Sequence, residues 1–334
     1  MMPNIRRPAA RTAVCLVALI AAACAPGSTR SEEMAELYLT PPDDLSPAQL
    51  APGEKLHVVA TTSILTDVVR RIAGDDVELI SLVPNGVDPH AFEPSPQDAR
   101  TLTEADAIFV NGFGLEAFLG DLIRQAGGDA PVISASEGIA PLPFEVQDRE
   151  GEAGEDGHGP DPHTWLDPNN VIRWTEDIER ALAALDPARA EAFAVNADSY
   201  RAELIELDAE LRQVTAAIPP ENRKLVTDHD ELGYFADEYG FTVVGTLIPG
   251  ASSLAEPSAA QLAGLLDAVA AERVPAVFVS SIVNPSLVET FAADAGIQVV
   301  TLYAHSLTDS GGPAPSYLEL MRYNAEAIAA ALTP

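Results

Sequence analysis

One apolar stripe of unusual length constrains the fold more than any other feature of this sequence. Apolar side chains recur at alternating intervals of four and three residues, at Phe193, Ala197, Tyr200, Leu204, Leu207, Leu211, Val214 and Ile218. This spacing places them on one face of a single helix. Asp186 followed by Pro187 predicts its N-cap and first residue, and Pro219 predicts its end. A helix over 187–218 is about 50 Å long, more than one small domain requires, so we expect it to bridge two domains.

Short apolar segments rich in β-branched residues alternate with helical patterns on both sides of this helix. They are 57–61, 78–83, 107–110 and 131–134 before it, and 224–227, 242–247, 276–280 and 297–302 after it. Such alternation is typical of α/β domains with mostly parallel sheets. The sequence therefore predicts an α/β fold of two lobes, 55–186 and 219–334, joined by one long rigid interdomain helix.

The N-terminus predicts export. Three arginines precede an apolar run over 12–23 that is too short to span a bilayer permanently. Small residues at the end of this run lead directly into Cys24, so that residues 1–23 resemble a bacterial lipoprotein signal with Cys24 as the lipidated residue. An ordinary cleaved signal is the alternative. Residues 24–54 lack periodicity and are rich in proline, serine, alanine and acids, and we expect a flexible tether there.

Cysteine usage and net charge limit both the atoms that could bind a metal and the kinds of molecule that the protein could bind. Cys15 and Cys24 both belong to the leader, so the mature body offers no thiolate, and any metal must be bound by nitrogen and oxygen. The formal net charge of −32 repels nucleic acid and anionic lipid head groups. Cations or neutral molecules remain as ligands, although solubility alone explains most of an acidic surface.

Four of the six histidines lie on loops that we place just past strand ends. They are His90, His163, His229 and His305. Ligands of open α/β sheets bind at the carboxyl ends of the strands, so we expect these four residues to meet in the cleft between the lobes. His57 begins a strand and His158 lies in an acidic, glycine-rich loop, and we expect neither to bind a ligand.

Two of the four histidines share an unusual setting. The phrase Asp-Pro-His, followed after one residue by an aromatic residue, occurs as DPHAF at 88–92 and as DPHTW at 161–165. Proline restricts the backbone before each ring, and the aromatic side chain can screen the site from water. Repeated histidines in equivalent places predict a metal site.

Seven segments between residues 55 and 334 carry a more specific signal. They are VVATTSILTDVVRRIAG, LVPNGVDPHAFEPSPQD, VNGFGLEAFL, DPHTWLDPNNV, TDHDELGYFADEYGF, SLAEPSAAQLAGLLDAV and LYAHSLTDSGGPAPSYLELMRYN. Together they resemble the substrate-binding proteins of zinc and manganese ABC importers. The resemblance implies two α/β lobes joined by a long helix, with a transition metal held between them. It also implies a monomeric binding protein without enzymatic activity, lipid-anchored on the outer face of the bacterial cytoplasmic membrane, that serves an ABC permease and its ATPase.

The resemblance also implies a ligand set. Carried over by position, the first three ligands of the family fall on His90, His163 and His229. The fourth is normally an aspartate, and the aligned residue here is His305. Four neutral imidazoles favour zinc over manganese, so we expect Zn(II) as the transported ion and keep Mn(II) as the alternative. If His305 is not a ligand, Asp309 or a water molecule is the expected fourth partner.

Acidic residues beside these histidines are expected to orient the rings and to offset the charge of the ion. The candidates are Asp88, Asp161, Asp228 and Asp230, each within two residues of a ligand histidine. The alternative for each is a turn cap. The acidic segment 145–161 lies where some zinc-specific relatives carry a histidine-rich loop, and its composition favours a solvated loop over a metal-gathering one.

Two functions of other classes remain as alternatives. An exported zinc hydrolase would keep three protein ligands and an open water position, and the sequence contains no HExxH motif. A surface adhesin has no support beyond the expected surface location.

Overall fold

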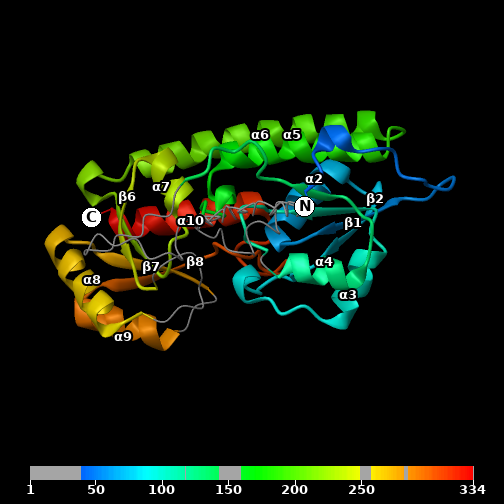
Figure 1. The fold of residues 1–334 in the computed structure, drawn as a ribbon. Helices are drawn as coiled ribbons and strands as arrows, with labels where there is room; N and C mark the ends of the chain where they lie inside the picture. The colour runs from blue at the N-terminus through cyan, green and yellow to red at the C-terminus, as the bar shows by residue number, and fades with distance from the viewer. Residues whose placement is uncertain (1–38, 117, 143–158, 249–256, 282–284, 334) are drawn as a thin grey trace, which may run out of the picture.

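The structure, a computed structural model, describes residues 39–116, 118–142, 159–248, 257–281 and 285–333 (Figure 1). The predicted signal with Cys24, the first part of the tether and most of the acidic segment with His158 lie outside the described residues. Among the residues that are described, no helix is both long enough and apolar enough to cross a membrane.

Two separate four-stranded parallel sheets form the two lobes. The first, in the order β2-β1-β3-β4, contains β1 (Leu56–Ala60), β2 (Val77–Ser81), β3 (Ala107–Val110) and β4 (Val132–Ser134). The second, in the order β6-β5-β7-β8, contains β5 (Lys224–Thr227), β6 (Thr242–Thr246), β7 (Ala276–Ser280) and β8 (Gln298–Leu302). The predicted α/β fold with two parallel sheets is confirmed, and no strand end differs from its predicted position by more than two residues.

Helices cover both faces of each sheet (Figure 1). The faces that contribute to the largest core cluster carry α2 (Ser63–Ala73) in the first lobe and α7 (Gly233–Tyr239) and α10 (Tyr317–Leu332) in the second. The opposite faces carry α3 (Pro96–Thr103), α4 (Leu119–Ala126), α8 (Ala259–Glu272) and α9 (Pro285–Ala295). Short 3-10 segments are η1 (Pro42–Asp44), η2 (Pro89–Ala91), η3 (Thr164–Leu166) and η4 (Pro220–Asn222).

The connection between the lobes is a hairpin of two helices, α5 (Pro168–Leu185) and α6 (Ala190–Ala216), which run side by side across both lobes (Figure 1). Six residues of the predicted stripe, from Phe193 to Leu211, are buried on α6, whereas Val214 is half-buried. α6 contacts α2 of the first lobe and α10 of the second. A helix that bridges the lobes is therefore present, and α5 is the partner that covers much of its length.

The predicted start of this bridging helix is wrong. Asp186 is the C-cap of α5, residues 187–189 form a turn, and α6 begins at Ala190. Proline disfavours the helical conformation of the residue before it, so Pro187 makes Asp186 leave the helix, with φ −130° and ψ 80°. The Asp186 carboxylate then pairs with the guanidinium of Arg189, within the turn.

One apolar core continues from lobe to lobe through the hairpin. Its largest fully buried side chains include Trp174 on α5, Tyr200 on α6 and Tyr317 at the start of α10. Burial of such large aromatic surfaces contributes strongly to stability. The two lobes are thus joined by side-chain packing as well as by the chain itself.

Residues 39–54, expected to belong to a flexible tether, pack on the first lobe instead. Leu39 pairs with Val132 on the edge strand β4. The backbone N–H of Ala48 donates to the carbonyl oxygen of Leu185 at 2.9 Å. The tether prediction does not hold for this part because the segment finds backbone and apolar partners on the lobe, which its composition alone does not reveal.

Candidate metal centre

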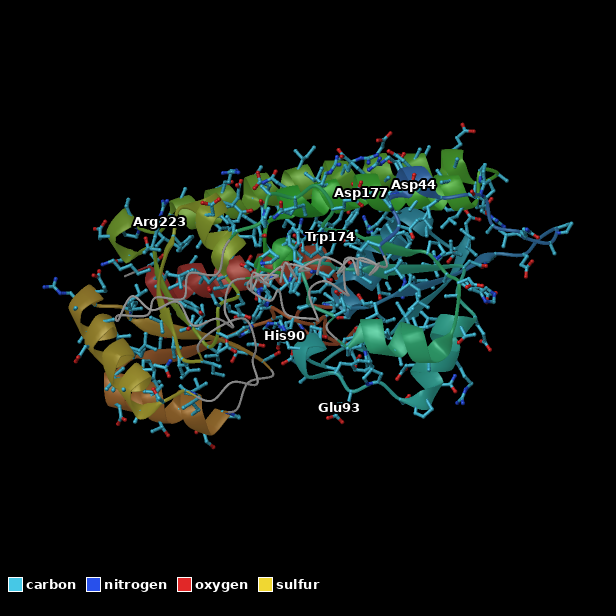
Figure 2. All side chains as sticks on the ribbon, viewed as in Figure 1. Asp44, His90, Glu93, Trp174, Asp177 and Arg223 are labelled. Carbon is cyan, nitrogen blue, oxygen red and sulfur yellow. The ribbon has the colours of Figure 1, made fainter. Side chains whose placement is uncertain are left out.

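The structure brings the four predicted histidines together from loops of both lobes. His90 lies in η2 after β2, and His163 immediately precedes η3. His229 follows β5 and His305 follows β8. Figure 2 shows His90 between the two lobes, in the middle of the molecule. The carboxyl ends of β2, β5 and β8 thus lead toward the site, as expected for parallel sheets, whereas His163 lies at the start of η3, far along the chain from the end of β4.

The ring nitrogens converge with the spacing of donors around a small cation. One nitrogen from each of the four rings lies within 4.8 Å of all the others. The Nε2 atoms of His90 and His163 are 3.1 Å apart, and those of His229 and His305 are 3.0 Å apart. Tetrahedral coordination with bonds of about 2.0–2.1 Å would place nitrogens about 3.3 Å apart. The four rings are thus arranged to bind one ion.

The site is largely closed to solvent. His163 and His229 are completely buried, His305 is nearly so, and His90 is half-buried. The indole of Trp165 packs against the His163 ring, with the centroids 5.3 Å apart. The other aromatic residue of the repeated phrase, Phe92, makes an edge-to-face contact with the ring of Phe118 instead. The expectation of an aromatic wall is therefore met by direct ring contact at His163.

Polar groups fix the rings from behind. The Nδ1 atom of His163 lies 2.8 Å from Oδ1 of Asp161, and that of His305 lies 3.0 Å from Oγ of Ser280. The Nδ1 atom of His229 lies 3.5 Å from Oδ1 of Asp228, without hydrogen-bond geometry. Contacts at Nδ1 leave Nε2 as the atom that faces a metal, and such contacts usually tune metal affinity.

The remaining acidic residues that the sequence proposed for the site each have a different setting in the structure. Asp88 caps η2, where its Oδ1 accepts the backbone N–H of His90 at 2.8 Å, so the turn-cap alternative describes this contact. Asp230 is half-buried. Asp309, the alternative fourth partner, is exposed, and its carboxylate lies 3.5 Å from the amide of Asn85. His305, rather than Asp309, is the residue that joins the other histidines.

Glu231 is a site residue that the sequence analysis missed. Its side chain is completely buried, and its Oε2 lies 3.2 Å from Nε2 of His305 and 3.9 Å from Nε2 of His229. The available signal was a charged residue two positions after a ligand histidine, next to the apolar start of a helix. The same reasoning selected Asp228 and Asp230 but passed over Glu231.

Burial sets the protonation of the metal-free site. Burial, together with the neighbouring rings of His163 and His229, lowers the pKa of His90 to about 3. Burial also holds the pKa of His163 and His305 well below the usual range. Burial raises the pKa of Asp161 to about 7 and that of Glu231 far above its ordinary value. The rings of His90, His163 and His305 therefore stay neutral at physiological pH, with their lone pairs available to a metal.

The sequence around these residues matches a known protein family. The model of the family described as "Zinc-uptake complex component A periplasmic" matches residues 58–331. The chain belongs to this family. The match includes all four histidines and Glu231, and membership makes the chain a metal-binding component of an ABC importer rather than an enzyme.

Curated relatives of this family member carry names that refer to manganese. The manganese-binding lipoprotein MntA of Halalkalibacterium halodurans is 33% identical over 321 residues, which are 96% of this chain and 97% of that protein. The manganese ABC transporter substrate-binding lipoprotein PsaA of Streptococcus pneumoniae is 34% identical over 287 residues, 84% of this chain and 90% of that protein.

Solved structures of similar proteins share the fold. The periplasmic zinc-binding protein TroA of Treponema pallidum has a TM-score of 0.74 and 29% identity, over 84% of this chain and 100% of that one. The manganese-bound periplasmic metal-binding protein of Candidatus Liberibacter asiaticus has a TM-score of 0.73 and 27% identity, with the same coverage. The similar proteins are thus named for two different metals.

Proposed function

We propose that this protein captures one divalent transition-metal ion through His90, His163, His229 and His305 and passes it to the permease of an ABC importer. The observation that carries the proposal is the convergence of four imidazoles, two from each lobe, within 4.8 Å in a buried site. Neutral imidazoles bind such ions well. A site between lobes can open toward a permease by small movements of its loops.

Manganese is the cargo that we propose. The names of MntA and PsaA support it, and so does Glu231, because a carboxylate beside the histidines suits manganese better than an all-nitrogen site does. Zinc is the second candidate, because four imidazoles favour it in the Irving–Williams order. We expect zinc to bind tightly and to compete with manganese.

The place of the protein follows from its relatives and its leader. MntA and PsaA are named lipoproteins, and the leader of this chain ends in Cys24. We propose an exported monomer that is lipid-anchored at Cys24 outside the cytoplasmic membrane, with its two lobes, 55–186 and 219–334, folded around the metal. Its partners are the permease and the ATPase of the importer.

Metal analysis and uptake together test the cargo. Protein purified without added metal should contain about one manganese or zinc per chain, and elemental analysis identifies which. A strain lacking the gene should lose uptake of that metal at limiting supply, and the wild-type gene should restore it. Manganese uptake that is unaffected by the deletion, with loss of zinc uptake alone, would assign the protein to zinc.

A further inference from the structure

Glu231 has an environment that the four histidines do not explain. It lies on the loop between β5 and α7, two residues after His229, and none of its side chain is exposed. Neither carboxylate oxygen accepts a hydrogen bond from an N–H or hydroxyl group, and the hydrogen-bond partner of the Glu231 carboxyl in the metal-free protein is another acid, Asp228. Buried carboxylates are normally paired or hydrogen-bonded, because burial without a partner is strongly unfavourable.

The charges around Glu231 make an ionised carboxylate at this position less favourable still. The carboxylates of Asp228, Asp88 and Asp161 all disfavour its charged form. Among the described residues, the basic side chains near its carboxylate are the rings of His229 and His305. Burial keeps the His305 ring neutral, so this ring supplies no positive charge. A carboxylate in this setting lacks a cation, and a divalent ion at the centre of the four rings would supply one.

The Glu231 oxygen lies beside the two histidine nitrogens of the second lobe. Oε2 lies 3.2 Å from Nε2 of His305 and 3.9 Å from Nε2 of His229, and the shorter contact does not have hydrogen-bond geometry. Neighbouring donors around an ion with bonds of about 2.1 Å are roughly 3.0–3.6 Å apart, so the distance to His305 fits a shared ion directly, and a small rotation of the Glu231 side chain would bring Oε2 into range of His229. We infer that Glu231 coordinates the captured ion through Oε2, as a fifth ligand beside the four histidines.

This inference rests on the proposed function and adds a specificity-determining residue to it. Structural zinc sites are almost always tetrahedral with four ligands. A fifth, oxygen donor raises the coordination number and the hardness of the site, and its negative charge lowers the net charge of the loaded site from +2 to +1. Glu231 therefore shifts the preference toward Mn(II) relative to a site of four imidazoles.

Cobalt(II) reports the coordination number directly. Its visible d–d bands are weak when the ion has five or six ligands and strong when it has four. Co(II) bound to the wild-type protein should show weak bands, and the nearly isosteric Glu231→Gln variant should show stronger ones. The same variant should lose at least about tenfold in Mn(II) affinity, with a smaller loss for Zn(II).

Asp161→Asn is the matched control. It changes another buried carboxylate of the site, which lies 2.8 Å from Nδ1 of His163, on the opposite side of that ring from Nε2. It should weaken binding while the band intensity remains that of the wild type. An equal rise in intensity in both variants, or none in Glu231→Gln, overturns the inference.

The Co(II) spectrum of the wild-type protein tests the inference by itself, even if Glu231→Gln does not fold. Strong four-coordinate bands for wild-type Co(II) would overturn the inference while leaving the proposed metal capture intact. A wild-type protein that binds neither Co(II), Mn(II) nor Zn(II) at one ion per chain would instead overturn the proposed function. Melting of the metal-free Glu231→Gln variant checks its fold, and its melting temperature should not fall, because the glutamate stabilises only the loaded site.

Discussion

At His163 and His305 a polar side chain fixes the ring before any metal arrives. Asp161 meets Nδ1 of His163, and Ser280 meets Nδ1 of His305. Rings that are already oriented lose little rotational freedom on binding, so the ion gains affinity from preorganisation. We therefore expect the loss of either ring to lower metal affinity more than it lowers the stability of the fold.

His229→Ala should keep the fold and lose most of the metal affinity. The ring belongs to the closest pair of the second lobe, with its Nε2 3.0 Å from that of His305. We expect affinity for Mn(II) and Zn(II) to fall by more than about 100-fold, beyond the effect of changing a residue that only supports a ligand. Competition with a chelator of known affinity measures the change.

His57→Ala provides the control for this substitution. His57 lies on β1, about half exposed, 3.4 Å from Glu78 on the neighbouring strand and away from the other histidines. Its affinity should equal that of the wild type. Equal affinity in His229→Ala and His57→Ala would remove His229 from the site.

His305 should also make the metal-free protein sensitive to acid. Burial keeps the pKa of the folded ring well below its usual range, whereas the unfolded ring takes up a proton below about pH 6.5. The folded state therefore binds fewer protons, and stability from this group is lost as the pH falls below that value. The loss is about 1.4 kcal/mol per pH unit.

His305→Gln removes this titration. In urea unfolding with a chelator, the free energy of unfolding of the variant relative to wild type should rise by about 1.4 kcal/mol per unit between pH 6.5 and 5. The raised pKa values of Asp161 and Glu231 act in the opposite direction in both proteins, so only the difference is diagnostic. Parallel curves would show that the ring is not kept neutral.

The histidines were predictable and Glu231 was not, for a physical reason. His90, His229 and His305 follow strands that the apolar pattern locates, and the carboxyl ends of parallel strands share one edge, whereas the repeated Asp-Pro-His phrase is the signal that selects His163. The direction of Glu231 depends on how the loop after β5 turns back over the His305 ring. A sequence pattern carries no information on that turn.

At the scale of elements, the α5–α6 hairpin shows where local signals compete. Asp-Pro begins α5 at 167–168 and ends it at 186–187, so the same dipeptide acts as a start and as a break. Which role applies depends on the partner helix, because α5 and α6 bury their apolar faces against each other. The bounds of the buried strands were predicted more accurately than those of these helices, because a continuous apolar run fixes where a buried strand begins and ends.

Leu207→Ala tests how far the hairpin supports the fold. Leu207 is completely buried in the middle of α6. We expect its truncation to lower the free energy of unfolding by about 2–5 kcal/mol, from lost burial and the cavity that remains. Chemical denaturation of the metal-free protein gives the value.

Ile205→Ala, two residues away on the same helix, is the matched control. Ile205 is 61% exposed, so the change should stay within about 0.5 kcal/mol. Both variants should bind metal normally once folded, because α6 contributes none of the site residues. A loss below 1 kcal/mol for Leu207→Ala would mean that the hairpin adds little to the shared core.

At the scale of the whole molecule, the proposed metal site lies between lobes that already share a core. His90 and His163 form one close pair of nitrogens, and His229 and His305 form the other. An ion therefore links two preformed pairs, while the core around α5 and α6 holds the lobes together without it. Metal removal should relax the loops of the site and leave the sheets and helices in place.

Calorimetry and circular dichroism test whether the core stays folded when the ion is removed. An ion that binds only the folded state at 100 times its dissociation constant adds about 2.7 kcal/mol, which corresponds to a rise in melting temperature of roughly 4–5 °C for a chain of this size. Chelation should reverse that rise without loss of the far-ultraviolet helix signal at 25 °C. His229→Ala should not show the rise, whereas Ile205→Ala should show it in full. Loss of helix signal on chelation would mean that the core does not fold without its ion, and that the metal is a structural part of the protein rather than a cargo that can be released.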